Sequence, residues 1–218
     1  MARLTLDCIK KKILNLFYLF RKNYLKLIRS LKTPPLPKNA DGKVYINLGC
    51  GPNTSQEFIN VDVLKLPHIH YINDIQNLNM FPDNYADMIY ASHVLEHISR
   101  NKLIDVLKEW RRVLKRGGRL RLAVPDFDRL IEVYKLSNND VMSIVSQLMG
   151  SSGEYDDHHT IWNYKFAKEL LESIGFDDVS IWDPNKADLH NFYDKSSRTI
   201  KVGDRTILIS LNIEAVKK

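Results

Sequence analysis

Two short apolar runs, each ending in residues suited to a ligand, constrain this chain more than any other feature. The first run, 44–48, breaks into a Gly-x-Gly turn at Gly49 and Gly51, and the second, 58–62, ends in Asp62. Glycine permits a positive φ in a tight turn and lets backbone approach a ligand closely. An acidic residue closing the next strand is placed to accept hydrogen bonds from a ribose diol. The pattern predicts two parallel strands of a nucleotide-type α/β fold.

The spacing of these residues argues against a dinucleotide site. Only 13 positions separate Gly49 from Asp62, against about 20 in the dinucleotide fingerprint. The third glycine of that fingerprint is also missing, because position 54 is Thr. Residues 52–57 leave room for no more than one turn of a first helix, so backbone amides of the glycine loop, not a helix dipole, should face the ligand. A nucleoside-like ligand without phosphates fits this loop better.

Motifs further along the chain resemble those of class I S-adenosylmethionine-dependent methyltransferases. Five ordered segments carry the resemblance: motif I at Leu48-Gly49-Cys50-Gly51-Pro52, the acidic motif after strand three at Asn73-Asp74-Ile75, the strand-four region at 81–97, the helix and Gly-Gly turn at 109–118, and the helix end at 170–176. They span residues 44–176. The subgroup that the chain resembles most is bacterial, has a shortened first helix, and often accompanies surface-glycan biosynthesis.

The resemblance implies S-adenosylmethionine as the cofactor and assigns residues to it. The implied cofactor-binding residues are Leu48, Gly49, Cys50, Gly51, Asp62, Asp74, Ile75, Ser92 and His93. Asp62 would bind the ribose hydroxyls and Asp74 the adenine, although both also suit surface turns. Cys50 is most simply the small residue between two glycines, and its distance in sequence from Cys8 fits no metal or redox motif.

The rest of the chain alternates short apolar runs with helix-period segments, as in βαβ units. Expected strands are 43–48, 58–62, 69–73, 86–91, 119–124, 178–183 and 206–215, and a helix is expected over 101–115 with Gly117 just past its end. The fold class is therefore α/β. By resemblance it is a Rossmann-like, mostly parallel seven-stranded sheet with helices on both faces and an antiparallel last strand. Residues 137–160 fit no strand and are expected to form a substrate-side insertion.

An N-terminal arm, residues 1–32, precedes this domain. It holds nine basic residues and one acidic residue, a net charge of +8, whereas the remaining 23 basic and 25 acidic residues give −2. Apolar residues share one face of a helical wheel over this arm and lysines the other. A basic amphipathic helix is typical of proteins that lie on an anionic membrane surface. Packing on the domain itself or on a second copy of the chain is the alternative.

The remaining composition narrows the partners and the location. Prolines in 33–42 end the arm and predict a linker to the domain at 43–218. No basic groove with interleaved aromatic residues is evident, so no nucleic-acid partner is expected. The arm lacks a signal-peptide cleavage site and no apolar run approaches the ~18 residues needed to cross a bilayer. We therefore expect a cytoplasmic protein, peripheral at the inner membrane face if the arm binds lipid.

Candidates for proton transfer are histidines near the expected strand ends. His93, directly after the fourth strand, is the first candidate for a general base or a wall of the cofactor pocket, and His159 is the second. His158 and His159 in the insertion, and Asp126 after the fifth strand, are candidates to bind the acceptor. Asp126 also suits the N-cap of the next helix. The long connection 184–205 is expected to reach the site rim through His190, Phe192 or Tyr193.

One segment resembles a zinc-peptidase signature. His93-Val94-Leu95-Glu96-His97 matches H-x-x-E-H, but the segment is short, follows a strand, and lies within the methyltransferase-like region. The sequence does not reveal a third ligand, which residues 157–159 would have to supply. We therefore expected no metal.

The expected function follows from these parts. The chain is interpreted as an S-adenosylmethionine-dependent methyltransferase acting on a small-molecule or glycan acceptor, most simply at oxygen. Methylation of a lipophilic molecule such as a quinone is an alternative that the arm would also suit. A cofactor-binding regulatory protein without turnover is another, and a nicotinamide-dependent dehydrogenase is the third.

Overall fold

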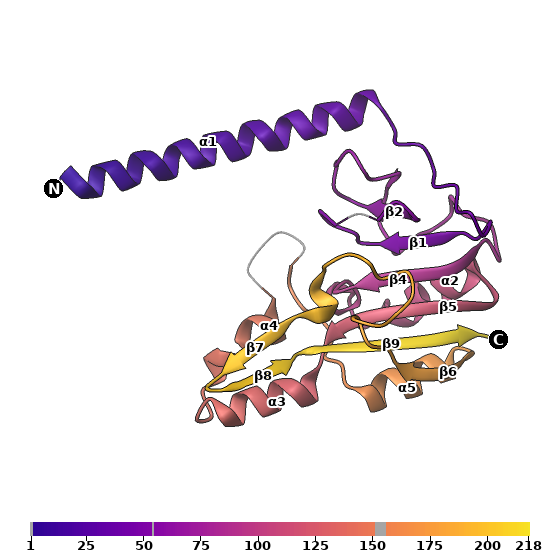
Figure 1. The fold of residues 1–218 in the computed structure, drawn as a ribbon. Coiled ribbons are helices and arrows are strands. Elements are labelled where there is room, and N and C mark those ends of the chain that lie inside the picture. Colours follow the sequence, from indigo (N-terminus) through magenta and orange to yellow (C-terminus); the bar gives the residue numbers. More distant parts are fainter. Residues whose placement is uncertain (1, 54, 151–155) are drawn as a thin grey trace.

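A twisted seven-stranded sheet forms the centre of the protein, for which a computed structural model describes residues 2–53, 55–150 and 156–218 (Figure 1). Its strands are β1 (Tyr45–Leu48), β2 (Phe58–Asp62), β3 (Tyr71–Ile72), β4 (Ala86–Ser92), β5 (Leu114–Pro125), β6 (Phe176–Ile181) and β9 (Ser210–Lys217). They lie in the order β3-β2-β1-β4-β5-β9-β6. The first five are parallel, whereas β9 runs antiparallel between β5 and β6. The mostly parallel α/β fold with an antiparallel last strand is confirmed.

Helices cover one face of this sheet. The described helices of the domain are α2 (Leu103–Val113), α3 (Phe127–Leu136), α4 (Val145–Met149) and α5 (Tyr164–Ser173), with short 3-10 turns η1 (Leu95–His97), η2 (Val141–Ser143) and η3 (Lys195–Ser197). Apolar stripes of α2 and α5 pack on alternate residues of the central strands, such as Ile46 and Ile89. The main core therefore lies between these helices and the sheet.

The sequence predicted helices on both faces of the sheet, but irregular chain and aromatic side chains cover the opposite face. Tyr45, Phe58, Tyr90 and Trp182 form an aromatic cluster there, against which Phe192 packs. In the described part of the chain the connection after β6 thus takes the place of a helix on this face. The reason lies in the short 52–57 segment, which leaves no chain for a helix after β1.

Several expected boundaries are corrected. The expected strand 206–215 is two strands, interrupted at Ile209: β8 (Arg205–Leu208) pairs with β7 (Thr199–Val202) in a separate hairpin, and β9 enters the sheet. The expected helix 101–115 ends at Val113. Gly117, with φ +73°, consequently lies within the segment assigned to β5, not directly after the helix.

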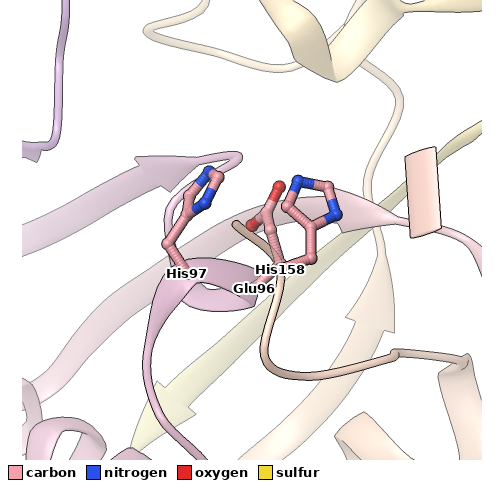
Figure 2. Close-up of side chains that lie close together, drawn as sticks. All are labelled: Glu96, His97 and His158. Carbon is pink, nitrogen blue, oxygen red and sulfur yellow. The ribbon is translucent and has the colours of Figure 1, made fainter. Parts of the chain in front are cut away.

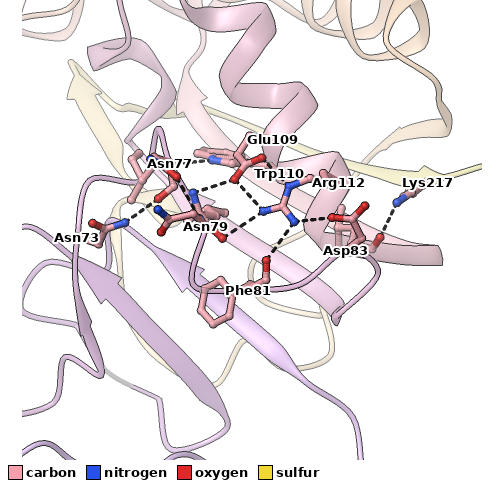
Figure 3. Close-up of polar contacts among 12 residues, drawn as sticks. Asn73, Asn77, Asn79, Phe81, Asp83, Glu109, Trp110, Arg112 and Lys217 are labelled. Carbon is pink, nitrogen blue, oxygen red and sulfur yellow. Dashed lines mark hydrogen bonds and ion pairs between the residues drawn. The ribbon is translucent and has the colours of Figure 1, made fainter.

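A polar network fixes the segment before β4 to helix α2 (Figure 3). The Arg112 guanidinium donates to the backbone carbonyls of Phe81 (3.0 Å) and Leu78 (3.2 Å) and pairs with Glu109. Glu109 in turn accepts the Leu78 amide at 2.9 Å. The Trp110 indole donates to the Ile75 carbonyl at 2.8 Å, which holds the segment that follows β3.

The N-terminal arm is the helix α1 (Ala2–Leu31), which projects away from the domain (Figure 1). Its C-terminal end is held by Arg29, which donates to the carbonyls of Ile69 (2.7 Å) and His70 (2.9 Å). Large apolar side chains of α1 are exposed: Leu14, Phe20, Tyr24, Leu27 and Leu31. In the part of the chain that the structure describes, no helix is both long enough and apolar enough to cross a membrane.

Candidate active site

The glycine loop after β1 has the conformation that its sequence predicts. Gly49 (φ +64°) and Gly51 (φ +56°) both adopt left-handed backbone conformations. A Cβ atom on Gly49 would lie 2.5 Å from Cγ2 of Val94, so the loop and the chain after β4 approach each other too closely for a side chain. The loop is tied to β2, because the Gly49 amide donates to Val61 O at 2.8 Å and the Gly51 amide to Asp62 Oδ2 at 2.7 Å.

A histidine that the sequence did not suggest also holds this loop. His68 Nε2 lies 2.9 Å from the carbonyl oxygen of Gly51. Because a carbonyl only accepts, this nitrogen donates the bond. His68 comes from the irregular segment between β2 and β3, and no motif at the sequence level marked it. The loop is therefore supported from its carbonyl side as well as by Asp62.

A cavity of about 450 Å³ lies at the carboxyl ends of β1, β2 and β4. Its lining includes Gly49, Asp62, Asp74, Ile75, His93, His97, Asp157 and His159. Asp62 is nearly buried and its second oxygen accepts the Leu64 amide at 2.9 Å, so the carboxylate is fixed in place. Asp74 is exposed and accepts the Gln76 amide at 2.9 Å. The structure thus brings together five of the residues expected at the cofactor: Gly49, Asp62, Asp74, Ile75 and His93.

A smaller cavity of about 140 Å³ adjoins the same loop and receives most of the others. Gly51, Cys50, Ser92 and His93 line it, together with Phe192 and Asp194. Leu48 is fully buried in the main core and supports the loop by packing. Burial, with the nearby Asp62 charge, raises the pKa of the Cys50 thiol well above its ordinary value. Cys50 therefore stays protonated and acts as a small residue.

Comparisons with known proteins agree with this geometry. Residues 47–122 match a family model described as a methyltransferase domain. An S-adenosylmethionine-dependent methyltransferase from Archaeoglobus fulgidus shares the fold over 92% of this chain and 99% of its own, with 19% identity and a TM-score of 0.50. Another from Methanosarcina mazei covers 80% of this chain and 92% of its own, with 15% identity and a TM-score of 0.50. A search of curated proteins found no match.

The family match supports a methyltransferase, the enzyme class expected from the sequence. The two solved structures share the fold, and each of them is described as an S-adenosylmethionine-dependent methyltransferase. The matched segment, 47–122, contains the glycine loop, both acidic residues and the strand-four region, but not the insertion or the arm.

His93 lies between the two cavities at the glycine loop, since it lines both the 450 Å³ and the 140 Å³ cavity. Its backbone is left-handed (φ +54°) and its side chain is nearly buried. Nδ1 lies 3.0 Å from Glu96 Oε1 and Nε2 lies 3.1 Å from the Ser210 hydroxyl. Both ring nitrogens are therefore engaged by protein groups, which fixes the orientation of the ring.

The two histidines of the insertion point to different places. His159 is exposed, its amide donates to the Glu96 carbonyl at 2.7 Å, and it lines the 450 Å³ cavity. His158 is partly buried, and its Nδ1 lies 2.9 Å from the Gln147 carbonyl. It lines a third cavity of about 50 Å³ together with His93. Burial lowers the pKa of His158, so the neutral imidazole predominates near neutral pH.

Asp126 is not brought together with these groups. Its carboxylate caps α3 by accepting the amides of Asp128 (3.0 Å) and Arg129 (3.4 Å), the competing role considered at the sequence level. It lines a separate cavity of about 780 Å³ with Trp182 and Arg205. Burial raises the pKa of Asp126 above its ordinary value.

The connection after β6 returns to the glycine loop, as the sequence suggested. Phe192 reaches the 140 Å³ cavity, and the adjacent Tyr193 is exposed. His190 instead packs on Tyr90 and bonds Ser196 at 3.1 Å. Asp194, which the sequence analysis missed, accepts a hydrogen bond from the Tyr90 hydroxyl and thereby fastens the connection over β4.

One further group of side chains lies beside the cofactor cavity. Glu96, His97 and His158 lie close together, with the Glu96 carboxylate between the two rings in the view of Figure 2. The group takes Glu96 and His97 from the H-x-x-E-H segment, but His93 is not part of it. Of these three, only His158 had been singled out as a candidate functional residue.

Proposed function

We propose that this methyltransferase transfers a methyl group to an oxygen atom of a small-molecule or glycan acceptor. The observation that carries the proposal is the single cavity lined by the glycine loop, Asp62 and Asp74. Its residues supply backbone groups and the carboxylates of Asp62, Asp74 and Asp157, but no lysine or arginine, which suits a nucleoside-like cofactor without phosphates. In the assignment implied by resemblance, Asp62 binds the ribose hydroxyls and Asp74 the adenine.

When bound, S-adenosylmethionine would supply the methyl group from its sulfonium sulfur, which would leave as the neutral thioether as the acceptor oxygen takes the methyl group. The acceptor proton would then go to a base or to solvent. The protein's part in such a reaction is to align the two reactants and exclude water. His93 and His159 are the proposed groups near the proton, because both line the cofactor cavity. His158 and His159 are the proposed contacts to the acceptor.

Helix α1 supports a location at the inner membrane surface. Its exposed apolar residues, among them Phe20, Leu27 and Leu31, share a helix with exposed lysines such as Lys11 and Lys26. Apolar burial and attraction to anionic headgroups act together in such helices. This favours an acceptor presented at the membrane, such as a lipid-linked sugar in polysaccharide biosynthesis. The same observation favours a lipophilic acceptor such as a quinone as the second candidate.

The decisive experiment is transfer of an isotopically labelled methyl group from S-adenosylmethionine to extracts fractionated into glycans, lipid-linked sugars and quinones. Label in a glycan or lipid-linked sugar, released as an O-methyl sugar on hydrolysis, is the expected result. Label in the quinone fraction would select the second candidate. Cofactor binding by calorimetry with no labelled product in any fraction would favour a regulatory protein without turnover.

A further inference from the structure

The group of Glu96, His97 and His158 has the composition of a metal centre. Glu96 and His97 lie in the 3-10 turn η1 after β4, and His158 comes from the segment that follows α4 (Figure 2). One carboxylate oxygen and one nitrogen of each ring lie within 4.8 Å of one another. The two imidazole rings are 4.9 Å apart between centroids and nearly perpendicular. Two imidazoles and a carboxylate are the donors that zinc and related divalent metals prefer.

Both histidines are held in the tautomer that metal binding requires. His97 Nδ1 lies 3.2 Å from the Asp157 carbonyl, and His158 Nδ1 lies 2.9 Å from the Gln147 carbonyl. Since a carbonyl oxygen only accepts, each Nδ1 carries the hydrogen and each Nε2 keeps a lone pair. Metal-binding histidines typically donate their other ring N–H to a carbonyl or carboxylate in this way.

Glu96 supplies the second, independent observation. Its side chain is fully buried, and the nearest side-chain donor to its carboxylate is His93 Nδ1, 3.0 Å from Oε1. A buried carboxylate beside one imidazole is costly unless a cation or further strong donors compensate it. The carboxylate instead lies between two imidazoles whose Nε2 atoms are acceptors, and two acceptors cannot stabilise it.

We propose that Glu96, His97 and His158 bind a divalent transition-metal ion of the zinc type through one carboxylate oxygen and two Nε2 atoms. Bonds of about 2.0–2.1 Å to a tetrahedral ion place its ligands roughly 3.3–3.5 Å apart. The side chains therefore close by rotation about their χ angles when the ion binds. Asp156 Oδ1, 4.0 Å from His97 Nε2, adds a second carboxylate beside the ion. Three protein ligands leave a coordination position open.

The position of the centre suggests its use, and this step rests on the proposed function. His97 lines the cavity assigned to the cofactor, whereas His158 lines the neighbouring 50 Å³ cavity with Lys195. An ion between them would face both. Its open position would bind the acceptor oxygen, lower the pKa of that hydroxyl, and align it with the methyl group.

Metal binding is testable without knowing the acceptor. The full-length, untagged protein is stripped with a chelator and titrated with Zn²⁺ by calorimetry, and Co²⁺ is added to a second sample to record visible absorption. One ion per chain with imidazole-type Co²⁺ absorption is expected. Loss of a partner that only orients a ligand costs about 10–100-fold in affinity, so His158→Ala should weaken Zn²⁺ binding by at least about 100-fold. His97→Ala should do the same.

The neighbouring His159→Ala is the matched control, because its ring is not part of the group, and it should retain the affinity for Zn²⁺. Equal weakening by His158→Ala and His159→Ala, or no saturable Zn²⁺ binding by the wild-type protein, would overturn the inference. Binding of S-adenosylmethionine, measured in the same samples, separates the two proposals. A protein that binds the cofactor but no metal contradicts this inference alone, and one that binds metal but no cofactor contradicts the proposed function.

Discussion

Asp62 is the residue at which the cofactor proposal can be tested most directly. Each of its oxygens already accepts one backbone amide, Gly51 at 2.7 Å and Leu64 at 2.9 Å, and each has a second lone pair, while the residue lines the cavity. Asp62→Ala removes a charged acceptor, whose hydrogen bonds contribute about 1.5–3 kcal/mol. Because about 1.4 kcal/mol corresponds to tenfold, cofactor affinity should fall roughly 10–150-fold. Isothermal titration with S-adenosylmethionine and its demethylated product measures this directly.

The same substitution also loosens the glycine loop, so two further variants separate the effects. Asp62→Asn keeps the size of the side chain, but its amide can accept only one of the two backbone N–H groups. It should bind the cofactor weakly while unfolding closer to the wild-type temperature than Asp62→Ala. Asp105→Ala, an exposed carboxylate in the first turn of α2, controls for the loss of negative charge. Wild-type cofactor affinity in a folded Asp62→Ala protein would refute the assignment of Asp62 to the site.

Three other perturbations test separate parts of the structure. Gly49→Ala places a Cβ 2.5 Å from Val94 and should lower the free energy of unfolding by about 2–4 kcal/mol. In Gly51→Ala the new Cβ meets nothing within 4 Å, so the loss should be only the ~1–2 kcal/mol of a left-handed residue. Equal losses for the two variants in urea titrations would contradict the contact with Val94. The hydrogen bond from Arg112, opposed by burial, holds the pKa of Glu109 below its ordinary value. This pair therefore stabilises the fold above about pH 4.3, and the contribution is lost as pH falls through the folded pKa. Glu109→Gln should flatten the pH dependence of the unfolding free energy in urea titrations from about pH 6 to 3, and an unchanged slope would contradict the contribution of this pair. Deleting residues 1–24, which keeps the Arg29 contacts, should abolish co-sedimentation with anionic liposomes and leave cofactor affinity intact. A change of oligomeric state without loss of liposome binding would instead favour packing of the arm on a second copy of the chain.

The parts of the fold that the sequence predicted are those determined by local chemistry. The limits of β2 were predicted at Phe58 and Asp62, because a mostly apolar segment follows the polar Glu57 and ends in Asp62. The turn at Gly49 and the position of Asp62 followed from the same two runs. The predicted strand boundaries were wrong where contacts between distant segments determine them. Apolar and polar residues alternate through most of 206–215, so the sequence does not show where one strand ends and the next begins. The division follows from pairing of β8 with β7 and from packing of Ile207 and Ile209 in one cluster with α3.

The candidate site was predictable only where its residues follow the strands that position them. His68 contacts Gly51 across 17 positions of sequence, and Asp194 contacts Tyr90 across 104. Such contacts depend on how irregular segments fold back over the sheet, and no periodicity encodes that path. His158 illustrates the same limit, since nothing in the sequence marks which of two adjacent histidines turns inward and which, as at His159, faces the cofactor cavity.

The cofactor cavity and the proposed metal centre cannot act independently, because they share side chains. His93 lines the cavity, and its Nδ1 lies 3.0 Å from the Glu96 carboxylate that would hold the ion. His97 contributes to both directly. A cation bound to Glu96 would compete with the His93 ring for the same charge, and would therefore change how His93 faces the cavity. Linkage then requires that the cofactor alter metal affinity by the same factor as the metal alters cofactor affinity. The buried carboxylate of Glu96, through His93, and the His97 ring are the groups through which the two sites would communicate.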